Sequence, residues 1–224
     1  MNILLELLQG FGLTLLLFAI TLVMAIPLGL LISFCSMSKF KVLSVLSRGF
    51  VWIIRGTPLL LQIRAISFIP SYVFGIPNKD IYVGLGITLS TLNFIFVVIA
   101  FVINYACYFS EIFRGGIESI SKGQYEAGQV LGMTKRQIFF NIVLLQVVKR
   151  IMPPMSNEII TLVKDTSLAR ILAVAELYFV AAEAVNIYVS LMPLVYAGLF
   201  YLLFNGLLTI LFGKIEKKLS YFRS

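Results

Sequence analysis

The 224-residue sequence contains no histidine, only two cysteines and few charged residues. Without histidine, imidazole acid–base catalysis, histidine-ligated metal sites and a haem on a proximal histidine are all excluded. The two cysteines, Cys35 and Cys107, fall inside apolar runs where free thiols pack as small hydrophobic groups, so we expect no structural disulfide. Charged residues make up 12% of the chain, whereas 60% is hydrophobic and the mean hydropathy is +1.00. Because this is too much apolar surface for one soluble core, we predict an integral membrane protein.

Nucleotide-binding and hydrolase motifs are also missing. No Gly-x-x-x-x-Gly-Lys-Ser/Thr occurs, so the chain has no P-loop for the phosphates of ATP, and no Gly-x-Ser-x-Gly marks a nucleophile. We therefore expect a non-enzymatic chain that binds no cofactor or metal of its own. Its energy would come from another chain or from an ion gradient. The net charge of +8 is interpreted as basic membrane loops rather than as nucleic-acid binding.

Long uncharged stretches predict where the chain crosses the membrane. Those at 7–38, 81–110 and 184–213 each contain 30 or more residues, and about 20 suffice to cross the hydrocarbon core. Two further apolar stretches carry a few charges. We predict an all-α integral membrane protein with about five transmembrane helices and a single domain over residues 1–224. The predicted spans lie near 11–36, 43–74, 81–110, 151–171 and 184–213.

The distribution of lysine and arginine predicts the orientation of these spans. Segments 38–48, 111–150 and 214–224 hold 3, 6 and 4 of these residues, whereas 1–10, 71–83 and 164–187 hold 0, 1 and 2. Because basic residues concentrate in cytoplasmic loops, the N-terminus is predicted to lie outside and the C-terminus in the cytoplasm. Glu176 and Glu183, in the last of the outer segments, are expected to be solvated.

The longest polar part of the chain, residues 111–140, is predicted to be a structured cytoplasmic loop. Ser121 with Gln124, and Thr134 with Gln137, have the spacing of capping boxes, and Gly132 can end the first helix. These signals predict two short helices. The first has a face of mostly small residues at i, i+3, i+4, i+7 spacing, formed by Gln124, Ala127, Gly128 and Leu131. This face either packs against the rest of the chain or receives a partner protein.

Five motifs follow one another along the chain. They are Arg55-Gly56-Thr57-Pro58-Leu59-Leu60 with Gln62, Glu111 with Arg114-Gly115-Gly116-Ile117, Lys122-Gly123-Gln124, Glu126-Ala127-Gly128 with Gly132, Ile142 and Leu144, and Asn157-Glu158 with Lys164-Asp165-Thr166-Ser167-Leu168. In this order and spacing the chain resembles the EAA-motif membrane subunits of ABC importers. Among these it is most similar to the polar amino acid permeases of the histidine, glutamine and arginine uptake group. It departs from their pattern at Gly128, usually alanine, at Leu145, usually proline, and at Arg64, where we expect an apolar residue.

The resemblance implies a permease subunit of the bacterial cytoplasmic (inner) membrane that works by alternating access. Its implied partners are a second permease subunit, identical or homologous, a cytoplasmic ABC ATPase dimer that binds ATP and magnesium, and an extracytoplasmic amino acid-binding protein. The resemblance also implies that the first loop helix is a coupling helix that docks on the ATPase. The residues assigned to this contact are Gln124, Glu126, Ala127, Gly128, Leu131 and Gly132.

Charged residues at membrane depth are candidate functional groups, because burying one costs at least about 2.5 kcal/mol. Arg55 and Gln62 are seven residues apart and share a face of the second span, and Glu158 lies at a comparable depth in the fourth. We hypothesise that Arg55 or the Gly56-Thr57 backbone, broken by Pro58, binds the carboxylate of an amino acid, and that Glu158 binds its ammonium or a cationic side chain. Alternatively, Arg55 pairs with Glu158 or Asp165 and holds the bundle together. Asp165 is expected to be a gate or structural residue.

Two other classes of transport protein stay open from the residues alone. An ion-coupled secondary amino acid transporter or a channel subunit would also have basic loops and charged spans. The small number of spans, the absence of a visible internal repeat and the structured cytoplasmic loop favour the ABC permease.

Overall fold

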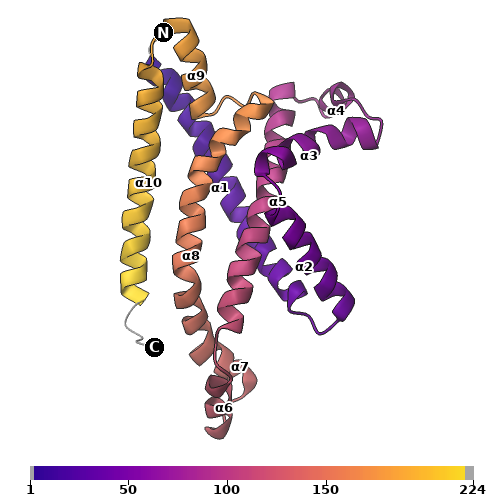
Figure 1. The fold of residues 1–224 in the computed structure, drawn as a ribbon, viewed down its shortest axis with the longest axis vertical. Helices are drawn as coiled ribbons and strands as arrows, with labels where there is room; N and C mark the ends of the chain where they lie inside the picture. Colours follow the sequence, from indigo (N-terminus) through magenta and orange to yellow (C-terminus); the bar gives the residue numbers. More distant parts are fainter. Residues whose placement is uncertain (1–2, 220–224) are drawn as a thin grey trace.

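The computed structural model describes residues 3–219, and every regular element within them is a helix (Figure 1). In chain order the elements are α1 (Ile3–Ser36), α2 (Lys41–Arg55), α3 (Leu59–Val73), α4 (Asn78–Gly84), α5 (Leu89–Glu118), α6 (Lys122–Val130), α7 (Lys135–Ile138), the π-helical turn η1 (Phe139–Val143), α8 (Leu144–Asp165), the 3₁₀ segment η2 (Thr166–Leu172), α9 (Leu177–Tyr188) and α10 (Met192–Leu219).

Five of these segments are suited to cross a membrane. Four are long apolar helices, namely α1, α5, α10 and the run Lys135–Leu172 that contains α8. The fifth is the pair of α2 and α3, which are bent by 109° around a short break. The prediction of an all-helical membrane protein with about five spans is therefore confirmed.

Two spans begin later than the uncharged stretches suggested. α5 starts at Leu89 rather than near residue 81, because Gly86 turns the chain at φ 66° and the Thr88 hydroxyl then caps the helix. α10 starts at Met192 rather than near residue 184, because the preceding residues form α9, which ends at the left-handed Val189. Both turns lie in uncharged sequence, so hydropathy alone does not reveal them.

The helices α1 and α5 form the central pair of the bundle. The buried residues of α1 recur every three or four positions and most are small, as at Gly10, Thr14, Thr21, Ala25, Gly29, Ser33 and Ser36. A Cβ atom on Gly29 would lie 2.8 Å from the carbonyl oxygen of Ala106, so glycine permits this close approach of the two backbones. On α5 the buried core residues include the aromatic side chains of Phe101, Tyr105 and Phe109. This pair is the scaffold against which α2, α3 and α8 place their polar groups.

The described parts of the three segments rich in lysine and arginine, up to residue 219, lie toward the same end of the molecule. α2 begins toward that end, α6 and α7 lie there, and α10 ends there, whereas the start of α1 and the helices α4 and α9 lie at the other end (Figure 1). This arrangement is the one that the five-span topology requires. The positive-inside rule assigns the basic end to the cytoplasm, and the orientation stays a prediction.

Glu176 is buried, so the prediction that it is solvated was wrong. Its side chain is fully enclosed, and its carboxylate accepts hydrogen bonds from the backbone N–H groups of Tyr178 and Phe179, at 2.8 and 2.7 Å. The Tyr201 hydroxyl donates to the same carboxylate at 3.1 Å. Glu176 therefore caps α9 and joins it to α10. Burial raises the pKa of Glu176, and these three hydrogen bonds oppose the increase.

Candidate functional site

The chain turns sharply between α2 and α3. Pro58 has no N–H to donate to the Ile54 carbonyl four residues earlier, and its ring would clash with that group, so α2 cannot continue through it. The helix ends at Arg55, and α3 begins at Leu59 in a direction that differs by 109°. We call residues 55–58 the α2–α3 break. The sequence thus places a cationic side chain and the start of a new helix at the same point.

Two cavities meet beside the α2–α3 break. The first, of about 560 Å³, lies between the break, α5 and α8, and its polar lining includes Thr57, Asn104, Tyr105, Thr161 and Asp165. The second, of about 470 Å³, extends toward the basic end, and its polar lining includes Glu111, Ser119 and Arg150. Three residues line both cavities: Arg55, Tyr108 and Glu158. The two cavities therefore adjoin one another, and we call them together the passage.

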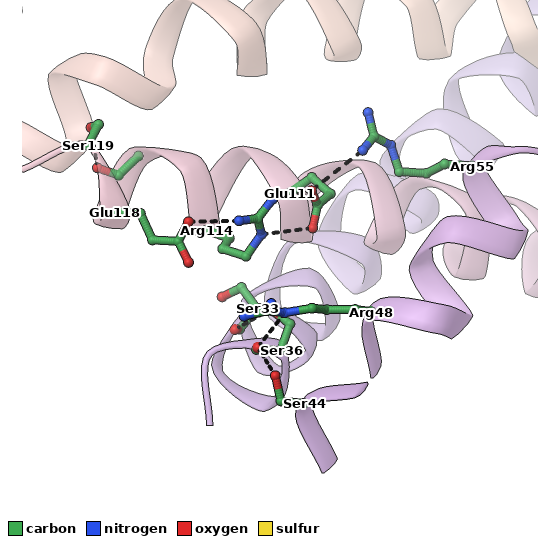
Figure 2. Close-up of polar contacts among 10 residues, drawn as sticks. Ser33, Ser36, Ser44, Arg48, Arg55, Glu111, Arg114, Glu118 and Ser119 are labelled. Atoms are coloured by element: carbon green, nitrogen blue, oxygen red, sulfur yellow. Dashed lines mark hydrogen bonds and ion pairs between the residues drawn. The ribbon is translucent and has the colours of Figure 1, made fainter. Parts of the chain in front are cut away.

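Arg55 reaches from the end of α2 toward α5 (Figure 2). Its Nη1 atom lies 3.7 Å from Oε2 of Glu111, and its guanidinium carbon lies 5.0 Å from the centre of the Tyr108 ring. The ion pair is long and the Arg55 side chain is 41% exposed. Because a pair of this kind contributes at most about 1 kcal/mol, Arg55 can exchange Glu111 for another anion at little cost.

Glu111 is held chiefly by Arg114, three residues further along α5. Arg114 donates from Nη2 to Oε2 at 2.6 Å and from Nε to Oε1 at 3.1 Å, which is a bidentate pair. The remaining Nη1 group of Arg114 donates to Glu118 at 2.7 Å (Figure 2). Arg114 is therefore the closer partner of Glu111, at 2.6 Å compared with 3.7 Å for Arg55.

One face of α8 supplies the acidic groups of the passage. Glu158, Thr161 and Asp165 are three and four residues apart, and all three line the first cavity. The buried Tyr105 hydroxyl donates to Asp165 at 2.7 Å. The Glu158 carboxylate accepts no hydrogen bond and forms no ion pair within residues 3–219, and the ion pair of Arg55 is with Glu111 instead. Glu158 can therefore bind a ligand, while Asp165 is fixed in the wall.

Gln62 and Arg64 lie outside the passage. Gln62 is absent from the lining of both cavities, and its side-chain amide folds back onto the α2–α3 break, with Nε2 only 2.7 Å from the Ile54 carbonyl oxygen. The exposed Arg64 lies over the ring of Phe68, at 5.9 Å from its centre. Of the four residues assigned to the substrate pathway from the sequence, Arg55, Thr57 and Glu158 each line at least one of these cavities, and Gln62 lines neither.

The helix α6 packs on the remainder of its loop through Gly128. A Cβ atom at Gly128 would lie 2.6 Å from Cγ1 of Ile138, which is fully buried in a small core with Ile120, Val143 and Val147. The neighbouring Gln124 accepts a hydrogen bond at 3.2 Å from Gln146 of α8. Gln124 and Gly128 therefore face inward. The glycine that departs from the usual motif is explained by the bulk of Ile138 opposite it.

The other residues assigned to the coupling contact are exposed. Glu126, Ala127 and Leu131 face outward, and Gly132 turns the chain at φ 72° just past α6. Val130 and Leu131 are 87% and 76% exposed, which makes them an apolar pair at the tip of the molecule. Sequence analysis did not single out Val130, which is the last residue of α6. The capping box of Thr134 and Gln137 is confirmed, whereas the one predicted at Ser121 is wrong because its hydroxyl makes no capping hydrogen bond.

Comparison with known proteins places residues 25–221 in the family described as "Binding-protein-dependent transport system inner membrane component". Among similar proteins, the arginine transport system permease protein ArtQ of Bacillus subtilis (strain 168) is 32% identical over 213 residues, which cover 95% of this chain and 91% of ArtQ. The L-cystine transport system permease protein TcyB of the same bacterium is 37% identical over 197 residues, or 87% of this chain and 78% of TcyB. A putative glutamine transport system permease protein, GlnP of Rickettsia conorii, is 31% identical over 204 residues, or 89% of this chain and 86% of GlnP.

Solved structures agree with this assignment. A chain from the crystal structure of an amino acid ABC transporter with histidines superposes with a TM-score of 0.77 and 26% identity, covering 95% of this chain and 94% of that one. A chain of the inward-facing MetNI methionine ABC transporter has a TM-score of 0.68 at 15% identity, covers 97% and 96% of the two chains, and shows the shared fold. These relatives favour the ABC permease over an ion-coupled transporter or a channel. The chain belongs to the family of binding-protein-dependent transport system inner membrane components, and it is a multi-pass membrane permease subunit of an ABC transporter.

Proposed function

We propose that this permease subunit imports polar amino acids, with a preference for those that carry a cationic side chain, along the passage between the α2–α3 break, α5 and α8. The observation that supports this most directly is that Arg55, Tyr108 and Glu158 line both cavities. A zwitterion that leaves water needs one partner for its carboxylate and another for its ammonium. A loosely held guanidinium and a carboxylate without a partner meet these needs.

The carboxylate of the substrate binds at the α2–α3 break. Arg55 releases Glu111, which keeps its bidentate pair with Arg114, and turns its guanidinium into the first cavity. The N-terminus of α3 adds the positive end of a helix dipole there, because Leu59, its first residue, lines the same cavity. Thr57 lines this cavity as well.

Glu158 binds the ammonium or the cationic side chain. Asp165 lies about 10 Å further along the same face of α8, at 1.5 Å per residue, so a cation that moves along the helix meets a second acid. Two carboxylates against one guanidinium leave the first cavity acidic, which supports a cationic substrate. The name of ArtQ, an arginine permease, agrees with this preference, whereas TcyB and GlnP are named for cystine and glutamine.

Energy and partners come from other chains. The permease pairs with a second permease subunit, and ATP and magnesium bind to a separate cytoplasmic ATPase dimer, since this chain has no P-loop. A binding protein delivers the amino acid from outside, where the N-terminus lies. The ATPase binds the outward surface of α6, which we call the coupling face and define as Glu126, Ala127, Val130 and Leu131. The inward Gln124 and Gly128, with the turn at Gly132, hold this face in position.

Uptake into proteoliposomes that contain both permease subunits, the ATPase and the binding protein tests this function. We expect labelled arginine to accumulate only when ATP is present on the side of the membrane where the ATPase lies. We also expect excess unlabelled lysine to compete with arginine better than excess glutamine does. Uptake by the permease alone, driven by a proton or sodium gradient, would contradict the ABC mechanism. Better competition by glutamine would overturn the cationic preference and leave the mechanism intact.

A further inference from the structure

The α2–α3 break is attached to α5 on both sides of its bend. On the α2 side, Arg55 contacts Tyr108 and Glu111. On the α3 side, Gln62 Oε1 accepts a hydrogen bond from Nδ2 of Asn104 at 3.0 Å. Asn104, Tyr108 and Glu111 are four and three residues apart, so they form one face of α5. The position of the bend relative to the passage therefore depends on two contacts with the same helix face.

Gln62 also donates to backbone carbonyl groups of the last turn of α2 and of the break. A helix leaves its last carbonyl groups without α-helical hydrogen-bond partners. The Gln62 Nε2 group lies 2.7 Å from the Ile54 carbonyl oxygen, 3.0 Å from that of Thr57 and 2.9 Å from the Thr57 hydroxyl. One side chain of α3 thus holds the last turn of α2, the break itself and, through Asn104, the neighbouring helix.

This network leaves no polar group of Gln62 facing the passage. Its amide nitrogen is directed at the break and its carbonyl oxygen at Asn104, which is 5% exposed. Gln62 is half-buried and lines neither cavity. A group that contacts the substrate would need a free polar atom toward the passage, as Glu158 has.

We infer that Gln62 is a positioning residue that acts through Arg55: it clamps the α2–α3 break to Asn104 of α5 and so keeps the Arg55 guanidinium at the boundary between the two cavities. The inference rests on the proposed role of Arg55 as the carboxylate partner. Loss of the clamp frees the last turn of α2, and Arg55 then spends less time where a substrate carboxylate can reach it.

The test compares Gln62→Met, which keeps the length of the side chain and removes its polar atoms, with Ser67→Ala. The control residue is also on α3 and buried, but within residues 3–219 its hydroxyl bonds only to its own helix, at the Arg64 carbonyl. Hydrogen exchange in the assembled permease–ATPase complex needs no substrate. We expect the amides of Gly56 and Thr57 to exchange about tenfold faster in Gln62→Met, which matches the loss of about 1.4 kcal/mol of hydrogen bonding, and at the wild-type rate in Ser67→Ala.

Binding of labelled arginine to the same complex shows whether the clamp acts through Arg55. We expect Gln62→Met to weaken binding about tenfold in the wild-type background and to have no further effect in Arg55→Ala, because effects that share one group are not additive. Unchanged exchange in Gln62→Met overturns the clamp, and additive losses of binding overturn its action through Arg55. If Gln62→Met fails to assemble, Gln62→Glu serves the same comparison, since it keeps the acceptor for Asn104 and removes the donors to the break. A wild-type complex that binds no amino acid would refute the proposed function, while the exchange rates still decide whether the clamp exists.

Discussion

The exposed pair of Val130 and Leu131 gives the most quantitative prediction for coupling. The two side chains are 87% and 76% exposed, and full burial of a valine or leucine is worth about 1.5 to 3 kcal/mol. If the ATPase covers both, replacing them with serine removes about 3 kcal/mol of binding free energy, after allowance for imperfect burial. This corresponds to an increase of about 100-fold in the dissociation constant.

The assay is titration of the ATPase into nanodiscs that contain the permease, at one fixed salt concentration. A matched control replaces Val83 and Leu85 with serine, because this apolar pair is 62% and 63% exposed. Val83 lies in the last turn of α4 and Leu85 directly follows this helix, at the opposite end of the molecule. We expect the control to bind the ATPase with wild-type affinity. An affinity of the Val130→Ser/Leu131→Ser variant within about twofold of wild type would refute docking through the coupling face, as would equal weakening in the control.

Three further predictions concern the loop, the capping carboxylate and the topology. In Gly128→Ala, overpacking against Ile138 should destabilise the loop by about 1 to 3 kcal/mol, and the higher helix propensity of alanine should offset about 1 kcal/mol of this. When thermal unfolding is measured, adding Ile138→Ala to this variant should destabilise the protein less than Ile138→Ala destabilises the wild type. Glu176→Gln should gain in unfolding temperature relative to wild type as the pH rises from the ordinary range of a glutamate. The reason is that burial raises the pKa of Glu176 in the folded protein, so the wild-type side chain contributes stability at low pH and loses it as the pH increases through the folded-state pKa. A difference in unfolding temperature between the two proteins that stays constant across pH would contradict this prediction. A cysteine at Glu126 should react with a membrane-impermeant reagent only from the cytoplasmic side and one at Asn78 only from outside, and labelling of both from one side would exclude the five-span topology.

Much of the fold follows from composition and spacing. The uncharged runs identify the long helices because a bilayer requires about 20 apolar residues per span. Pro58 predicts a break in the backbone at Gly56-Thr57, but the 109° bend of the second span was not predicted. A sequence of apolar residues on both sides of a proline is compatible with a kinked span and with a sharp break, and only the packing of α3 against α5 selects the break.

The candidate site was predicted in part for similar reasons. Charge at membrane depth is costly, so Arg55 and Glu158 could be found from the sequence alone. The direction of a side chain is harder to find. Gln62 shares a helical face with Arg55 only if the helix is continuous, and the break removes that relation. Gly128 faces Ile138 rather than the outside because the loop folds on itself, which the periodicity of one short helix does not specify. Glu176 caps a helix that lies inside an uncharged stretch.

Binding of labelled arginine to the purified permease–ATPase complex, without the binding protein, tests most directly whether Glu158 binds the transported amino acid. Glu158→Gln removes the charge and keeps the shape, and Glu183→Gln, at an exposed position of α9, is the matched control. We predict that Glu158→Gln weakens arginine binding by about tenfold or more, with unchanged assembly and unfolding temperature, while Glu183→Gln binds as wild type does. Wild-type binding by Glu158→Gln, or a loss of binding that accompanies equal losses of assembly and stability, would contradict a role for Glu158 in recognising the substrate.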